Sequence, residues 1–281
     1  EIPLRLVGSE MCIRDRSGSD CRKLQGTGDR WRYIMEIRLD KYLADMSAGT
    51  RSEVKKYIKA GRVQVDQFCE KDAARKIDPG KNRVELDGKQ ISYQKYEYYM
   101  LNKPAGVVSA VSDKKDRTVL DLISDGRKDL FPVGRLDKDT EGLLLITNDG
   151  ELAHRMLSPR KHVDKKYYVR IDGNVTPEMH RKLEEGVFIE QDILSKPAKL
   201  KIINNQETES EVCITIHEGR FHQVKKMFGA VGRNVLYLER ISFGPLVLDQ
   251  NLPRGSARTL TPEERKLLEP YMDTKDQEME E

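Results

Sequence analysis

The apolar positions of this chain are most densely grouped near its middle. Four consecutive apolar residues, 143–146, lie between Gly142 and the turn Asn148–Gly150. A short continuous apolar run bounded by glycine and turn residues predicts a fully buried strand. Charged side chains stand at its entrance: Arg135, Asp137, Asp139 and Glu141. Because a packed strand holds such groups more accurately than a free loop, this stretch is either the support of a chemical site or a charged hairpin before a core strand.

Helical spacing of apolar residues appears in the first third of the chain. One apolar stripe runs over 39–46, and a second follows over 54–58. Gly61 is placed to end the second helix, and the alternation of apolar and polar residues at 63–65 predicts a strand. Two helices and a strand are therefore expected in this region.

The first 34 residues show no such periodicity, because glycines and scattered arginines interrupt every apolar run. Their segment 5–16 looks like translated adapter or vector sequence. We predict a disordered or non-native leader over 1–34, with the structured chain beginning at Met35. The alternative is a genuine disordered basic arm.

A basic stripe lies along the second predicted helix. Its members are three or four residues apart: Arg51, Lys55, Lys59 and Arg62. Glu53 is the acidic residue that opposes them within the helix. Such a stripe can neutralise several phosphates of RNA or DNA at once, although a solvated helix face has the same appearance.

Short strands outnumber helices beyond a polar, tyrosine-rich linker at 89–97. Strands are expected at 98–102, 167–171, 187–191, 198–204, 212–216, 234–241 and 246–248. Helices are expected at 119–123, 152–157, 176–186 and 219–232, and again after Thr261. Strands that are often sequential neighbours predict an α+β domain on a mostly antiparallel mixed sheet. We place a small helix-rich domain at 35–92, this larger domain at 97–272 and an acidic disordered tail at 273–281.

Composition excludes several classes of protein. The chain has 281 residues, of which 37% are apolar and 35% charged, and its longest apolar runs fall far short of the roughly 20 residues that span a bilayer. Its four cysteines and five histidines show no metal-ligand spacing, so we assign no metal and expect a reducing cytoplasm. Between Glu263 and Glu281 eight acidic residues face three basic ones, which leaves the rest of the chain at +8. Excess positive charge favours a polyanionic partner.

Residues 37–92 resemble an S-four-like RNA-binding domain, a small helix-helix-strand module of a ribosomal protein. Four segments carry the resemblance: the R-L-D-K-Y-L opening at 38–43, the helix entry at 50–52, I-K-A-G-R-V-x-V at 58–65 and I-x-P-G at 77–80. The turn Ala48–Thr50 departs from the usual apolar-glycine-serine pattern. In this family the basic second helix lies against structured RNA, which agrees with its charge.

Segments of the larger domain resemble the signature segments of pseudouridine synthases. They are Lys103–Gly106, Gly134–Leu144, Lys165–Val169 and Glu218–Met227. Within that superfamily, 158–163 and 252–255 look like the branch that modifies small-subunit ribosomal RNA. The resemblance covers Met35 to about Tyr271. It implies a catalytic domain that isomerises a uridine of ribosomal RNA to pseudouridine, without a cofactor, and the large-subunit RNA is the alternative substrate.

The resemblance also implies roles for three residues of the larger domain. Asp137 is the catalytic carboxylate, which either attacks the ribose or removes a proton from its carbon 2′. Lys225 is the cation that keeps this carboxylate ionised; many relatives have arginine there, and lysine lacks the bidentate geometry. Tyr167 is placed to stack on the flipped uracil, and its alternative role is that of a core aromatic.

Further residues are candidates for binding RNA. By the same resemblance, Arg135 matches the position that fills the space left by the flipped base; its alternative role is a salt bridge with Asp139 or Glu141. His222 and Gln223 either bind RNA or order their loop. A basic stretch is either a phosphate-binding strip or a solvated loop; its members are Arg160, Lys161, Lys165 and Lys166. The expected partner is ribosomal RNA or the pre-ribosomal small subunit, with no membrane partner, and the chain is expected to be a monomer.

Two other classes of function are open from the residues. A noncatalytic RNA-binding or ribosome-assembly factor has no need of an acid at 137, so the intact Asp137, Tyr167 and Lys225 argue against it. A glycoside hydrolase with a pair of carboxylates rests on Asp137 and Glu141 alone, and nothing else in the chain supports it.

Overall fold

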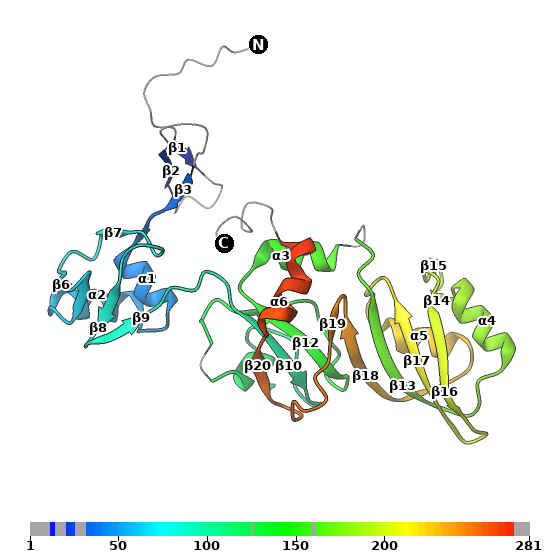
Figure 1. The fold of residues 1–281 in the computed structure, drawn as a ribbon. Helices are drawn as coiled ribbons and strands as arrows, with labels where there is room; N and C mark the ends of the chain where they lie inside the picture. The colour runs from blue at the N-terminus through cyan, green and yellow to red at the C-terminus, as the bar shows by residue number, and fades with distance from the viewer. Residues whose placement is uncertain (1–11, 15–20, 26–31, 125, 159–160, 273–281) are drawn as a thin grey trace, which may run out of the picture. The chain divides into compact units, whose positions relative to one another are not determined.

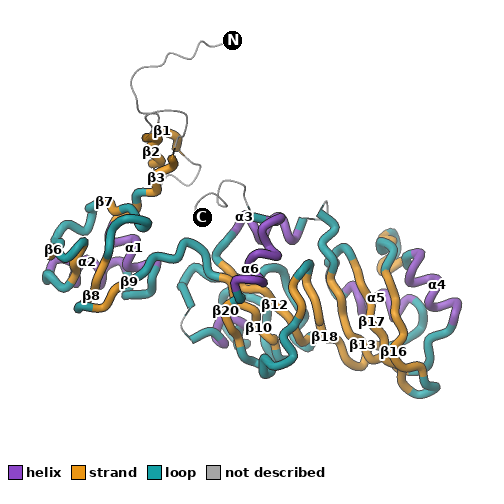
Figure 2. Tube along the Cα trace, in the orientation of Figure 1, coloured by secondary structure: helices purple, strands orange, loops and turns teal. Residues whose placement is uncertain are grey.

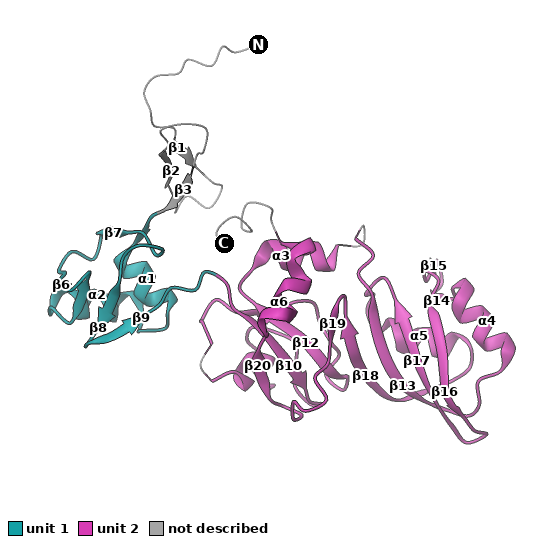
Figure 3. Cartoon of the chain, in the orientation of Figure 1, with its two compact units in different colours: residues 1–95 teal, residues 96–281 magenta. Residues whose placement is uncertain are grey.

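A computed structural model describes residues 12–14, 21–25, 32–124, 126–158 and 161–272. The chain divides into two compact units, 1–95 and 96–281 (Figure 3). The boundary falls within the polar segment 89–97 that the sequence marks as a linker.

Most of the predicted leader lies outside the described residues. Where no regular element was expected, three short strands form a sheet in the order β1-β2-β3: β1 (Cys12–Arg14), β2 (Cys21–Gln25) and β3 (Arg32–Met35). Backbone pairing in such a sheet needs no apolar periodicity, so the sequence pattern did not reveal it.

The remainder of the first unit combines two helices with short strands (Figure 1). The elements are β4 (Ile37–Arg38), α1 (Leu39–Asp45), α2 (Arg51–Lys59), β5 (Val63–Val65), β6 (Phe68–Cys69), β7 (Lys76–Ile77), β8 (Val84–Leu86) and β9 (Lys89–Ile91). The strands pair as β4-β7 and as β6-β5-β8-β9. The two helices and the strand after them are confirmed, but the expected predominance of helix is not.

The start of α2 shows how sequence defines this unit. The Thr50 hydroxyl accepts a hydrogen bond from the Glu53 backbone, and the Glu53 carboxylate accepts one from the Thr50 backbone. This capping box satisfies two backbone donors that the helix cannot satisfy itself. Val54 and Ile58 then bury one face of the helix in the core of the unit, which leaves the opposite, basic face in solvent.

The second unit is built on a nine-stranded sheet (Figure 2). Its main strand order is β16-β17-β13-β18-β12-β10-β20, and β11 and β19 pair with β12 and β18. The strands are β10 (Tyr98–Lys103), β11 (Phe131–Pro132), β12 (Glu141–Thr147), β13 (Lys165–Asp172), β16 (Lys199–Asn205), β17 (Glu209–Ile216), β18 (Val235–Phe243), β19 (Leu246–Val247) and β20 (Ala257–Thr259). Of the pairings between these strands, β12 with β18 is parallel and the others are antiparallel. The sheet is therefore mixed and mostly antiparallel, as expected.

Helices cover both faces of this sheet. The helical elements are η1 (Val119–Leu122), α3 (Gly150–Leu157), α4 (Pro177–Glu185), α5 (Gln223–Ala230), α6 (Pro262–Leu268) and η2 (Glu269–Tyr271), and β14 (Phe188–Glu190) and β15 (Ile193–Leu194) form a separate hairpin. Side chains of α3 and α6 pack in one hydrophobic cluster, and those of α4 and α5 pack in another.

Strand β12 separates the two clusters. Leu143 and Leu145 belong to the cluster of α3 and α6, whereas Leu144 and Ile146 belong to that of α4 and α5. Successive side chains of a strand point to opposite faces, so a continuous apolar run fits a strand that is covered on both sides. The fully buried strand predicted from the sequence is confirmed.

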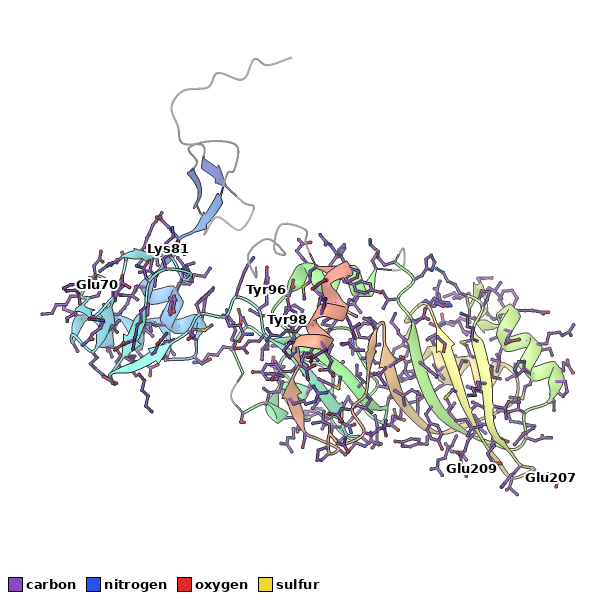
Figure 4. All side chains as sticks on the ribbon, in the orientation of Figure 1. Glu70, Lys81, Tyr96, Tyr98, Glu207 and Glu209 are labelled. Atoms are coloured by element: carbon purple, nitrogen blue, oxygen red, sulfur yellow. The ribbon has the colours of Figure 1, made fainter. Side chains whose placement is uncertain are left out.

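The start of the second unit is joined to α3 through aromatic residues. The rings of Tyr96 and Tyr98 lie 6.4 Å apart (Figure 4). The Tyr98 hydroxyl donates a hydrogen bond of 2.9 Å to the carboxylate of Asp149, which also caps α3. This bond connects β10 to the turn that follows β12.

Candidate active site

The loop between β11 and β12 carries Asp137, and a buried lysine holds this loop in place. Lys103 Nζ donates hydrogen bonds to the carbonyl oxygens of Asp137 at 3.0 Å, Lys138 at 3.2 Å and Thr140 at 2.8 Å. A further bond of 3.1 Å reaches the carbonyl of Pro104. Burial lowers the pKa of Lys103 to about 8. One ammonium group thus ties the backbone on both sides of the loop's turn to the end of β10.

Ser109 fixes the same loop from the other side of Asp137. Its hydroxyl donates to the carbonyl of Leu136 at 2.8 Å and accepts from the Leu136 amide at 3.1 Å. The Gly106 amide donates to the carbonyl of Lys138 at 2.8 Å. The Asp137 side chain therefore projects from a backbone with little freedom, which is the usual requirement for a reacting group.

A lysine and a histidine from another part of the sequence face Asp137. Lys225 Nζ, from α5, lies 3.5 Å from one carboxylate oxygen, and His222 Nε2 lies 3.6 Å from the other. Lys225 also donates a hydrogen bond of 2.6 Å to Asp139, and this bond lowers the pKa of the Asp139 carboxyl. The structure brings Asp137 and Lys225 together as the sequence predicted, but Lys225 is shared with a second carboxylate.

A pocket of about 120 Å³ opens beside Asp137. Its apolar walls include Leu136, Ile216, Val224 and Leu238. Its polar lining includes Arg135, Asp137, Thr140, Lys165, Tyr167, Arg220, His222, Gln223 and Arg240. Tyr167 is 7% exposed and belongs to the hydrophobic core as well as to the pocket, so its two predicted roles do not exclude each other.

Arg240 is a site residue that the sequence reasoning missed. It lies on β18 opposite Tyr167 of β13 and is only 2% exposed. Its Nε donates a hydrogen bond of 2.8 Å to the carbonyl of Leu143. Burial lowers the pKa of the Arg240 guanidinium, while the Tyr167 hydroxyl raises it. The sequence did contain an indication of this inward position, because Arg240 is two residues from the apolar Leu238 and therefore lies on the same face of the strand.

Gly142 permits the close approach of the strands at this point. It adopts φ of +96°, and a Cβ atom there would lie 2.4 Å from the backbone oxygen of Arg240. Any larger residue would push β12 away from β18 and move both the Asp137 loop and the guanidinium.

The members of the predicted phosphate-binding strip differ in their exposure. Lys165 is buried, lines the pocket and donates a hydrogen bond of 2.9 Å to the carbonyl of Val163. Burial lowers the pKa of Lys165 to about 8, and the positive charge of the nearby Arg240 acts in the same direction. Its side chain alternates inward along β13, a placement that a basic run in sequence does not reveal. Lys161 is exposed, and Arg160 lies outside the described residues.

The other predicted contacts differ in their surroundings. Arg135 is exposed at the pocket and, within the described part of the chain, has no hydrogen bond or ion pair. The alternative salt bridge is not formed, because Asp139 bonds to Lys225 and Glu141 pairs with Arg254 at 3.2 Å. Arg135 is therefore available to an incoming ligand.

His222 and Gln223 lie at the start of α5. Gln223 donates a bond of 2.6 Å to Glu218 and accepts one of 2.9 Å from the Arg220 amide, so it orders the loop. His222 has a left-handed backbone with φ of +52° and stacks on Phe221 at 3.8 Å. Phe221 is 71% exposed, which makes it an accessible aromatic surface beside the site.

The basic stripe of the first unit is largely free. Arg51, Lys55 and Lys59 are exposed along α2, and Lys55 lies 3.9 Å from Asp40. Arg62 instead forms an ion pair with Asp87 and lies over the Tyr57 ring at 4.3 Å. The first three residues are consequently better placed than Arg62 to meet phosphates.

Two features of the described residues bear on other classes of protein. They contain no group of three or more histidine, cysteine or acidic side chains arranged to hold a metal ion. None of the helices described is long and apolar enough to cross a membrane.

Comparison with known families defines the class of this protein. The model of the RNA pseudouridylate synthase family matches residues 97–230, and that of the S4 domain matches residues 37–82. The chain thus joins an S4 domain to the catalytic domain of an RNA-modifying enzyme.

Individual relatives extend the match over most of the chain. An uncharacterized RNA pseudouridine synthase of Bacillus subtilis (strain 168), YtzG, is 47% identical over 83% of this chain and 98% of its own length. Ribosomal small subunit pseudouridine synthase A of Vibrio vulnificus is 40% identical, over 81% and 97% of the two chains. Ribosomal large subunit pseudouridine synthase B of Bacillus subtilis is 37% identical, over 84% and 97%. A crystal structure of a pseudouridylate synthase superposes with a TM-score of 0.58 at 35% identity, over 82% of this chain and 99% of that one.

This protein belongs to the RNA pseudouridine synthase family and is a pseudouridine synthase. The noncatalytic and glycoside hydrolase alternatives are therefore set aside.

Proposed function

We propose that the protein converts a specific uridine of small-subunit ribosomal RNA to pseudouridine, with Asp137 as the catalytic residue. The observation that carries this proposal is the position of Asp137, which lines a small pocket together with Tyr167 and lies within 3.6 Å of both Lys225 and His222. An ammonium group close to a carboxylate stabilises its negative charge. The 40% identical relative acts, by its name, on the small subunit.

The proposed reaction is an isomerisation in which atoms and electrons balance. Asp137 either attacks carbon 1′ of the ribose or removes the proton of carbon 2′, and the bond from carbon 1′ to N1 breaks with its electron pair going to the base. The base turns within the pocket and carbon 5 bonds to carbon 1′. On the first route the bond from carbon 1′ to Asp137 breaks in this step, and on the second route the proton held by Asp137 returns to carbon 2′. Carbon 5 then loses its proton and N1 gains one.

Other residues of the pocket act on the base and its surroundings. Tyr167 stacks on the uracil, which must first leave its RNA stack at a cost of a few kcal/mol. The exposed Arg135 fills the space that the base leaves. Lys225 faces the charge of Asp137 at 3.5 Å, and its bond to Asp139 fixes the position of its ammonium group.

Small-subunit and large-subunit RNA are the two candidate substrates, since relatives with either name match nearly their full length. The segments 158–163 and 252–255 favour the small subunit. We further propose that the chain acts in the cytoplasm as a monomer, because it carries its own RNA-binding unit.

The test is the release of tritium from RNA labelled at carbon 5 of uridine, because this proton leaves during the reaction. Small-subunit and large-subunit transcripts and precursor particles are incubated separately with the full chain. Chemical labelling of pseudouridine then maps the modified position, and rRNA from cells without the protein should lack the same one. Absence of release from every substrate would refute the proposal, and release from large-subunit RNA alone would select the alternative.

A pH dependence follows from the buried Lys165. Its pKa of about 8 means that the cation is present below this pH and is lost as the pH rises through it. Because both RNA and a departing uracil are anionic, we predict that kcat/KM falls above about pH 8. Lys165→Arg, which stays charged, should move this fall to higher pH in the tritium-release assay. An unmoved fall would exclude Lys165 and point to Lys103, whose pKa is also about 8.

The basic stripe of α2 gives a second prediction. The double change Lys55→Ala and Lys59→Ala should weaken RNA binding and reduce the slope of log affinity against log salt by about 1.5, as expected for two lost phosphate contacts. Lys81→Ala with Lys89→Ala removes the same charge from other exposed positions of this unit and serves as the control. Equal slopes in the two variants would assign the stripe to a solvated face.

A further inference from the structure

Two buried polar atoms at the pocket lack any partner within the described part of the chain. They are Arg240 Nη2 and Thr140 Oγ1. Arg240 is 2% exposed and Thr140 is 1% exposed, and both line the pocket beside Asp137. A buried polar group without a hydrogen bond is destabilising, so two of them at one pocket indicate that a ligand supplies the missing partners.

The guanidinium of Arg240 is held rigidly in place. Its Nε donates a hydrogen bond of 2.8 Å to the Leu143 carbonyl, and its Cζ lies 4.8 Å from the ring centre of Phe243. Gly142 lets the two strands approach closely enough for this contact. A fixed donor needs no reorganisation when charge develops on a ligand, which is the condition for strong electrostatic stabilisation.

The surroundings favour a ligand that is neutral on entry and becomes anionic during reaction. The pocket has apolar walls around a volume of about 120 Å³, with Lys165 as a second buried cation. A flat base with two carbonyl groups matches one guanidinium donor and one hydroxyl donor. A phosphate keeps its charge throughout and is best solvated, so it fits a rim better than this interior.

We propose that Arg240 Nη2 and Thr140 Oγ1 donate hydrogen bonds to the carbonyl oxygens of the flipped uracil, and that Arg240 stabilises the detached base. This inference rests on the proposed function. When the bond from N1 to carbon 1′ breaks, its electron pair spreads over the ring and the two carbonyl oxygens. The negative charge disappears again once carbon 5 has bonded to carbon 1′, carbon 5 has lost its proton and N1 has gained one. Arg240 is thus a catalytic residue, and Thr140 acts on the same base.

The first experiment separates kcat from KM in the tritium-release assay. Arg240→Gln should lower kcat on the order of 100-fold, as for the loss of one preorganised donor to a developing anion, with KM for RNA changed less than threefold. Thr140→Val, which keeps the side-chain shape, should lower kcat about tenfold. Arg127→Gln is the matched control, because Arg127 is also buried, at 6% exposed, but lies outside the pocket; its folded fraction should keep the wild-type kcat.

The second experiment changes the carbonyl oxygens themselves. RNA containing 2-thiouridine or 4-thiouridine carries a poorer hydrogen-bond acceptor at one carbonyl. Wild-type enzyme should be slowed by the substitution at the carbonyl that Arg240 binds. Arg240→Gln should be slowed less by that same substitution, whereas a residue with a purely structural role leaves the two effects equal.

The outcomes distinguish this inference from the proposed function. A wild-type protein without activity on any RNA refutes the proposed function. If the wild type is active and Arg240→Gln and Thr140→Val have the same kcat as Arg127→Gln, the inference is overturned. A rise of KM alone also overturns it, because that result indicates a phosphate contact. If Arg240→Gln does not fold, Thr140→Val and the thiouridine comparison in wild type decide, and normal rates in both overturn it.

Discussion

Replacing Asp137 by asparagine should abolish pseudouridine formation. Asparagine keeps the size of the side chain but removes the negative charge that faces Lys225 and His222. Without a carboxylate there is no nucleophile and no base at the ribose, and losses of roughly 10³-fold or more are usual for such a residue. The tritium-release assay should show this loss while gel-shift measurements show RNA affinity within about threefold of wild type.

The neighbouring carboxylate supplies the control for this change. Asp139→Asn removes a charge two residues away on a side chain that is 72% exposed, and it should lower activity far less, because Asp139 is not among the residues that line the pocket. If Asp137→Asn kept full activity, the mechanistic assignment would be wrong even though the family membership would stand.

Lys103→Met should damage both stability and turnover. The change removes four hydrogen bonds and leaves the carbonyls of Asp137, Lys138 and Thr140 without their donor. Breaking such a buried set costs about 2–4 kcal/mol of unfolding free energy, measurable by urea denaturation. Because the loop that aims Asp137 is released, kcat should fall on the order of 100-fold.

A surface lysine provides the comparison. Lys182 forms a 2.8 Å ion pair with Glu178 along α4, and exposed pairs of this type contribute at most about 1 kcal/mol. Lys182→Met should therefore leave kcat unchanged and the unfolding free energy nearly so. Equal unfolding free energies for the two variants would show that Lys103 does not hold the loop.

Local sequence patterns were sufficient to predict the elements whose burial depends on the spacing of their own apolar residues. The run at 143–146 has no polar position, so it predicted a strand that is covered on both faces. Strand β12 is such a strand. The basic stripe of α2 follows from a period of 3.6 residues, and its exposure follows from the apolar face opposite. The proximity of Asp137 and Lys225 was predicted from the family resemblance, because no local pattern links positions 88 residues apart.

The buried cations escaped the sequence reasoning for a common physical reason. Lys103, Lys165 and Arg240 each stand in or at the end of a strand, where a lone basic residue is normally solvated. Their burial depends on the strands and loops that pack over them, as when the carbonyls of the Asp137 loop surround Lys103. A basic run such as 160–166 hides the fact that one member points inward.

By itself, the sequence determined the buried strand and the helix with its basic face, and its resemblance to a family predicted Asp137 as the reacting carboxylate. Tertiary structure alone decided which cations are buried, which carboxylates share Lys225 and which polar atoms at the pocket lack partners. The physical reason is that a hydrophobic period depends on residues that are close in the sequence, whereas the desolvation of a charge depends on groups that belong to distant strands.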